Sequence, residues 1–169
     1  MNHEIGSLDR CVDVYCASVA QGDIARAYRG ILSTLIQFKS SWESAHPADS
    51  VGALYQGYLD MSFVAVAPAA LAENRLKISL VFLHPEGVFS LWLIAGNRAI
   101  QKSISDSLRR LPLGGYSLCK LEPGVDAIIA RDLPKPYQFD QPDALNAFLM
   151  RSAEAFTADM IALVDAMER

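Results

Sequence analysis

The chain has 169 residues, of which 51% are hydrophobic and 20% charged, and its formal net charge is −4 at pH 7. This length predicts a single domain over residues 1–169, and the hydrophobic fraction excludes a disordered protein. The acidic balance argues against a general nucleic-acid binder, because such proteins usually carry a basic excess that neutralises phosphates.

The sequence predicts a cytoplasmic protein. Residues 1–7 show no basic segment followed by an apolar one, so we expect no secretory signal. No apolar run approaches the about 20 residues that a membrane-spanning helix needs, so we expect no membrane contact. The three cysteines, Cys11, Cys16 and Cys119, are odd in number and lack Cys-x-x-Cys spacing, which suits free thiols in a reducing compartment.

Two helices are predicted before any strand. The first is capped by Ser7 and ends at Gly22, and the second is capped by Asp23. The apolar stripes at helical spacing are Leu8, Val12, Tyr15 and Val19 in the first, and Ile24, Tyr28, Ile31, Leu35, Phe38 and Trp42 in the second. We therefore expect a helical hairpin over residues 7–45 that packs on an α+β core over residues 54–169.

Three central segments are predicted to be strands: Tyr58–Ala67, Leu76–His84 and Val88–Ala95. Most of their residues are apolar on both faces, so helices should cover the sheet from two sides. Pro85-Glu86-Gly87 joins the second and third segments with good turn chemistry, which indicates an antiparallel hairpin.

A middle helix begins at Asn97 and stops before Pro112, and a last helix follows Asp140. Between them, Tyr116–Leu121 and Ala127–Arg131 are weaker strand candidates. The predicted fold class is α+β, a mostly antiparallel sheet of three to five strands in the order ααβββαβ(β)α.

Signatures of familiar catalytic sites are missing. The order αβββαβ resembles the core of restriction-endonuclease-like nucleases, but Val88–Ala95 contains no carboxylate, and Arg75 stands where their metal-binding Glu-x-Lys needs a glutamate. The histidines lack metal-ligand spacing, and the phosphate-binding glycine loops and the nucleophile elbow do not occur. We expect no catalytic metal and no cofactor.

The best candidate site is a run of polar residues that leads into the first predicted strand: Tyr55, Gln56, Tyr58 and Asp60. The face that carries Gln56, Tyr58 and Asp60 becomes apolar at Val64, so its polar groups must be hydrogen-bonded or lie in a cleft. Gly57 would allow a backbone or a ligand to approach closely. A structural polar network and a ligand pocket both stay open as interpretations.

A second group of candidates follows the second and third predicted strands: His84, Asn97, Arg98 and Gln101. Arg98 lies beside the free amides at the start of the middle helix, which suits an anion; a solvated helix face is the alternative. His84 is either a strand-end residue bonded to backbone or an acid/base. We expect Gln56, Tyr58, Asp60 and Arg98 to converge at one end of the sheet.

The segment Leu54–Ser62 resembles the Leu-Tyr-Gln-Gly-Tyr-x-Asp-Met-Ser signature of a small bacterial family of unknown function. Other elements similar to that family are Val81–His84, Trp92-Leu93, Gly96-Asn97-Arg98 with Gln101, and Gly124-Val125-Asp126. The resemblance implies that Tyr55–Ser62 and Gly96–Gln101 form one patch. It implies no activity, cofactor or substrate.

These features favour a binding or interaction module without catalytic metal, whose partner is a small molecule or a protein. One alternative is an enzyme with Asp60 or His84 as acid/base and an anion at Arg98. Another is a degenerate nuclease-like domain that binds nucleic acid without cutting it. A homo-oligomer is also open, since a second copy could cover a sheet face that the helices leave bare.

Overall fold

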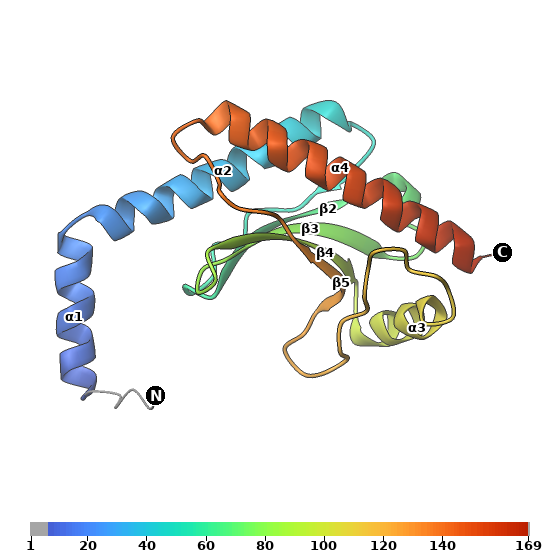
Figure 1. Cartoon of the computed structure of the whole chain (residues 1–169), viewed down its shortest axis with the longest axis horizontal. Coiled ribbons are helices and arrows are strands. Elements are labelled where there is room, and N and C mark those ends of the chain that lie inside the picture. The colour runs from blue at the N-terminus through green and yellow to red at the C-terminus, as the bar shows by residue number, and fades with distance from the viewer. Residues whose placement is uncertain (1–6, 169) are drawn as a thin grey trace.

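The computed structural model describes residues 7–168, in which four α-helices and a five-stranded antiparallel sheet follow each other in the order ααβββαβα (Figure 1). The α-helices are α1 (Leu8–Ala20), α2 (Asp23–Ala45), α3 (Arg98–Leu108) and α4 (Pro142–Met167), and a short 3₁₀ turn, η1, spans Ala69–Leu71. The strands, in both chain and sheet order, are β1 (Ser50–Val51), β2 (Met61–Ala67), β3 (Leu76–Leu83), β4 (Val88–Ala95) and β5 (Ala127–Asp132). The predicted α+β class is confirmed. Residues 1–6, on which the expected lack of a secretory signal rests, lie outside the described range.

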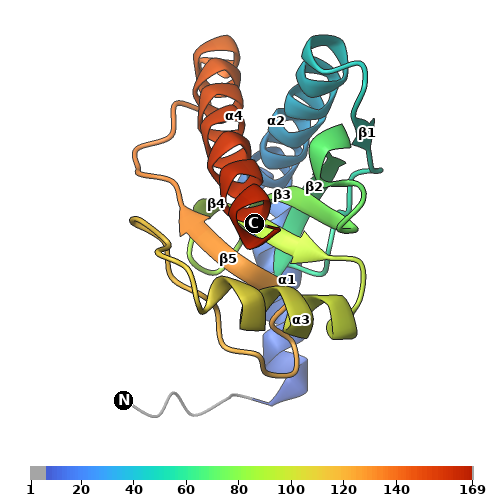
Figure 2. The same cartoon turned by 90° about the vertical axis from the view of Figure 1, so that its right-hand side faces the viewer.

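The core lies between one face of the sheet and the pair α2 and α4, which run side by side over it (Figure 2). Leu80 pairs with both Val64 and Leu91, so their side chains share this face. The helices contribute the fully buried residues Leu35, Phe38 and Trp42 from α2 and Leu149, Phe156 and Met160 from α4. The apolar face predicted for the second helix thus packs in the core from about the middle of the helix to its end.

α3 lies on the other side of the sheet, beyond the end of β4 (Figures 1 and 2). Asn97 caps it as predicted, because its Oδ1 accepts the backbone N–H of Ile100 at 2.9 Å. Ile104 and Leu108 are its buried apolar residues. The sheet is therefore covered on one face by two long helices and on the other by one short helix at one end.

α1 directly precedes α2, as predicted, but it does not pack back along α2. At Gly22 the chain turns, with φ 88°, and α1 projects away from the sheet (Figure 1). None of its residues is buried: Leu8 is 79% exposed and Tyr15 is 60% exposed. The first helix has an apolar stripe, but the described part of the chain offers that stripe no apolar surface of matching length.

The strands differ from the sequence prediction chiefly in three ways, besides one-residue shifts at the ends of β3 and β5. The first predicted strand begins at Met61 instead of Tyr58, because Leu59 has a left-handed φ of 65° that breaks the extended chain. The two-residue strand β1 was not predicted, since two residues give no alternation to detect. The predicted strand Tyr116–Leu121 is reduced to one bridge, between Leu118 and Ile129.

Adjacent α2 residues provide a direct test of where the core lies. Leu35→Ala should lower the free energy of unfolding by about 2–5 kcal/mol, because it opens a cavity in a fully buried position. Ile36→Ala, at a position that is 50% exposed, should cost less than about 1 kcal/mol. Urea denaturation of both variants checks this, and similar losses would contradict the placement of α2.

Candidate functional site

The predicted site residues lie at two opposite ends of the sheet. Tyr55, Gln56, Tyr58, Asp60 and His84 are at the end where β3 turns into β4, and Asn97, Arg98 and Gln101 are at the other end (Figure 1). The register shows this directly: Met61 at the start of β2 pairs with Leu83, whereas Ala95 at the end of β4 pairs with Leu76.

The prediction that Asp60 and Arg98 converge is therefore wrong. β4 runs antiparallel to β3, so it carries the chain away from the end where β2 begins. The shared patch implied by the resemblance, between Tyr55–Ser62 and Gly96–Gln101, is excluded for the same reason. An acid/base at Asp60 or His84 beside an anion at Arg98 is excluded as well.

Arg98 and Gln101 hold a loop against α3. The Arg98 guanidinium donates to Gln101 Oε1 and to the carbonyl of Val125, both at 2.6 Å, and also to the carbonyl of Glu122. Gln101 is only 3% exposed and donates to the carbonyls of Val125, at 3.0 Å, and Ala127, at 3.3 Å. The Arg98 guanidinium, which was expected to bind an anion, thus donates to backbone carbonyl oxygens instead. Together, Arg98 and Gln101 hold the loop that leads into β5.

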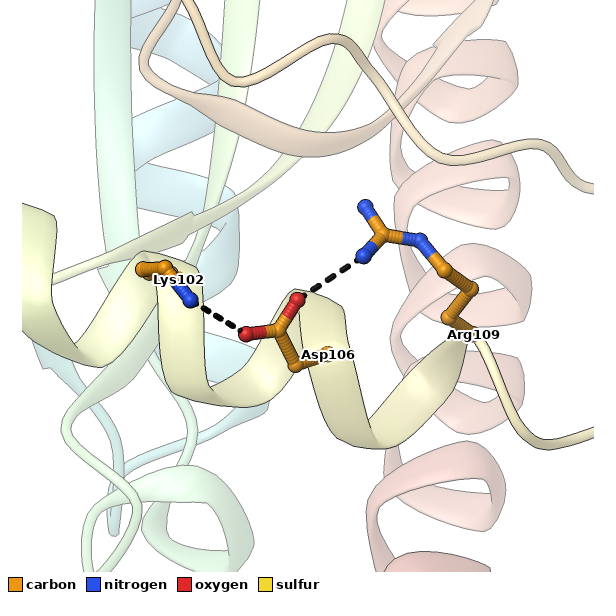
Figure 3. Close-up of polar contacts among 3 residues, drawn as sticks. All are labelled: Lys102, Asp106 and Arg109. Atoms are coloured by element: carbon orange, nitrogen blue, oxygen red, sulfur yellow. Dashed lines mark hydrogen bonds and ion pairs between the residues drawn. The ribbon is translucent and has the colours of Figure 1, made fainter.

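Lys102 of α3 and Arg109, which caps the end of this helix, are both paired with Asp106 (Figure 3). Asp106 accepts from Lys102 Nζ at 2.7 Å and from Arg109 at 2.8 Å. The hydrogen bond from Lys102 is the main reason why the pKa of the Asp106 carboxyl is below its usual range, and Arg109 adds to it. The helix presents a mixed charge pattern, and the expectation that nucleic acid is not bound stays a prediction.

At the Asp60 end, a polar network joins α2 to the two central strands. The carbonyl of Gln56 accepts from Ser62 Oγ at 2.5 Å and from the Tyr28 hydroxyl at 3.0 Å. His84 Nε2 lies 2.9 Å from Ser62 Oγ. Ser62 has one hydroxyl hydrogen, which it gives to Gln56, so His84 Nε2 carries the hydrogen of this second contact and Ser62 accepts it.

Asp60 shapes the loop instead of orienting His84. Its Oδ1 accepts the backbone N–H of Tyr58 at 2.9 Å, and its carbonyl accepts the N–H of His84 at 2.9 Å. Backbone hydrogen bonds, first from Tyr58 and then from Met61, lower the pKa of the Asp60 carboxyl. Although Asp60, Ser62 and His84 are close, Ser62 is fully buried and donates to a carbonyl, so they do not form a nucleophile with its base.

Gly57 and Leu59 give the loop an unusual backbone. Gly57 has φ 72°, and a Cβ there would lie 1.8 Å from the carbonyl oxygen of Met61, so the close approach expected at this glycine is made by backbone. Leu59 also has a positive φ, which costs a residue with a Cβ about 1–2 kcal/mol. Tyr58 and Leu59 nevertheless face solvent, at 91% and 58% exposure.

A mainly apolar groove opens beside this loop, in the bend between α1 and α2. We call it the elbow groove. Its volume is about 520 Å³, and its lining includes Tyr15, Val19, Ile24, Tyr28, Tyr58, Leu59 and His84. Burial lowers the pKa of the His84 imidazole, and the charge of Asp60 opposes this to a smaller extent. Tyr55 takes no part in the lining, because its ring stacks on Phe63 with a 4.8 Å centroid separation.

Sequence reasoning found Tyr58 and His84 but missed the helical side of the groove. It took Tyr15, Val19, Ile24 and Tyr28 as core-facing stripe residues. The only signal that could have separated them was the glycine at position 22, which allows the two stripes to diverge.

Within residues 7–168 no group of histidine, cysteine, aspartate and glutamate could hold a metal ion, and none of the described helices could span a membrane.

The chain is thus an α+β domain with two helices over one face of a five-stranded antiparallel sheet and a projecting N-terminal helix. It belongs to the family described as Domain of unknown function (DUF7000), whose model matches residues 8–164. No curated protein and no solved structure was found to match. The family match extends from α1 into α4, so α1 is part of the family's domain.

Two glycines test the backbone interpretation of the loop. Gly57→Ala should lower the free energy of unfolding by at least about 2 kcal/mol, because a Cβ would overlap the Met61 carbonyl at a positive φ. Gly30→Ala is the matched control: its Cβ would meet open space within α2, so stability should rise by up to about 1 kcal/mol. Equal effects in thermal or urea unfolding would contradict this difference.

The lowered pKa of His84 predicts a pH dependence of stability. The unfolded chain binds the proton more readily than the folded one, so His84 disfavours folding as the pH falls below the ordinary histidine value of about 6.5, and this effect is absent above it. Urea denaturation between pH 8 and pH 5 should show this loss, and His84→Gln should reduce it. His46→Gln leaves the His84 surroundings intact and should keep the loss. Identical pH profiles for all three proteins would disprove the assignment.

Proposed function

We propose that this domain is a protein-interaction module that binds its partner through α1 and the elbow groove. The observation that carries the proposal is a folded amphipathic helix, α1, that buries no residue. Isolated helices shorter than about 12–15 residues are marginal in water, and most helix stability in proteins comes from packing. A helix of 13 residues with a bare apolar stripe therefore needs a surface to cover it.

Exposed apolar side chains are concentrated at this end of the molecule. The arm surface, as we name it, consists of Leu8, Val12, Tyr15, Val19, Ile24, Tyr58 and Leu59. Five of these, all except Leu8 and Val12, line the elbow groove, so helix and loop residues form one continuous patch. Large apolar patches of this kind mark interaction sites in proteins that fold on their own.

The loop adds an argument of a different kind. An exposed leucine at a positive φ is unfavourable for the fold, since glycine or asparagine would adopt that backbone more easily. Backbone strain of this sort is concentrated at functional sites. Contact of the Leu59 side chain with a partner would explain why a leucine occupies this unfavourable position, next to the still more exposed Tyr58.

A protein partner accounts for more of this surface than a small molecule does. A small ligand in the elbow groove would cover Tyr28, Leu59 and His84, but it would leave Leu8 and Val12 of α1 bare. The enzyme alternative is not supported, since its anion at Arg98 is at the far end and Ser62 is buried. The nuclease-like alternative gains no support from Lys102 and Arg109, because both cations are paired with Asp106.

Site-specific photo-crosslinking tests the proposal. A photoreactive phenylalanine analogue placed at Tyr15 or Tyr58, in cells that naturally make the protein, should give discrete protein adducts. The same analogue at Lys77, which is exposed at the other end of the sheet, should not. Adding Leu59→Asn should weaken the Tyr58 adduct while the fold is retained, because asparagine tolerates the left-handed φ. Adducts absent from both arm positions, or equally strong at Lys77, would disprove the proposed function.

A further inference from the structure

We infer that the partner is a second copy of this chain: two copies pack their α1 helices antiparallel about a two-fold axis, and each α1 enters the elbow groove of the other. The inference rests on the proposed function and names its partner. A two-fold contact uses the same patch on both subunits, so that patch must be complementary to itself. The arm surface meets this requirement because it contains both a projecting helix and a groove.

The spacing of the α1 stripe suits an antiparallel copy. Leu8, Val12, Tyr15 and Val19 are separated by four, three and four residues, an order that reads the same in both directions. When a second α1 lies antiparallel, Leu8 is therefore opposite the partner's Val19, and Val12 is opposite the partner's Tyr15. This arrangement leads the Leu8 end of each α1 toward the groove that Val19 and Ile24 line in the other copy.

The charged residues of α1 do not oppose this packing. Asp9, Arg10 and Asp13 lie outside the stripe, at the rotation of about 100° per residue that an α-helix makes. Packing through the stripe consequently leaves these side chains at the margin or on the outer face, and no unpaired charge has to be buried.

The arm surface supplies a large part of the area that a stable dimer buries. The seven arm-surface side chains are between 37% and 91% exposed. With on the order of 200 Å² for a fully exposed aromatic side chain, Tyr15 and Tyr58 alone present about 300 Å² per copy, and the five aliphatic side chains add to this, against about 800 Å² per partner in a standard-size interface. Covering them would also supply the packing that α1 lacks, and a second copy is present wherever the chain itself is made.

Sedimentation velocity of the full chain, followed to about 100 µM, tests the inference through mass action. The wild-type protein should sediment as a species of twice the 18.5 kDa chain mass. Val12→Glu should raise the dimer dissociation constant at least 10-fold, because it places a charge in the centre of the stripe. Val14→Glu is the matched control: Val14 is 59% exposed on the same helix but lies away from the stripe, so its dissociation constant should stay within about twofold of wild type.

Unfolding should not cause the loss of dimer, because α1 buries no residue. Both variants should keep the wild-type near-ultraviolet circular dichroism spectrum. Amide exchange at residues 8–20 should slow with protein concentration in the wild type and not in Val12→Glu. A monomer at the highest concentration, or equal losses from Val12→Glu and Val14→Glu, would overturn the second-copy inference.

The photo-crosslinks separate this failure from a failure of the proposed function. Tyr58 adducts that contain two differently tagged copies of the chain support both. Adducts with another protein, alongside a monomeric wild type, would overturn the second-copy inference and keep the interaction module. A monomer that gives no adduct at either arm position would overturn both.

Discussion

The apolar face of α2 is longer than the sheet on which it packs. A helix of 23 residues spans about 34 Å, at 1.5 Å per residue, whereas strands of 8 residues span about 27 Å. The helix therefore extends beyond the sheet, and its first turns have no strand beneath them. Leu35, Phe38 and Trp42 are buried, while Ile24, on the same stripe, is 48% exposed. α1 is attached to this free end, which is why it finds no cover.

Tyr28 marks the position where α2 leaves the sheet. Its hydroxyl donates to the carbonyl of Gln56, and its ring lies 5.6 Å from that of His84. Through Ser62, the same network connects α2 to β2 and to the end of β3. These contacts fix the start of the core at Tyr28. The first turn of α2 continues beyond the core, and the direction of α1 is set by the turn at Gly22.

The parts of the fold that depend on burial could be predicted from the sequence. β3 and β4 are apolar along their length, and Asn97 is a strong cap, so their positions follow from local pattern. The turn between β3 and β4 predicted their antiparallel pairing, but the direction of β2 relative to this hairpin has no such local signal. Because β2 also runs antiparallel to β3, Asp60 lies at the end of the sheet opposite Arg98. The alternation of apolar residues also carries no information about φ, so it did not predict that the strand would be interrupted at Leu59. For α1, amphipathicity predicts an apolar face but not what covers that face.

The segment before β2 combines two roles that alternate along the chain. Gln56, Gly57 and Asp60 act through the backbone: a carbonyl that accepts two hydroxyls, a close approach to Met61, and a carboxylate that accepts a main-chain N–H. Tyr58 and Leu59, between them, point outward. A loop held this firmly by a rigid sheet can keep two large side chains in an exposed and strained arrangement, and recognition residues are commonly supported in this way. On this view the buried polar network is structural, and its purpose is to present the apolar residues that the proposed interaction uses.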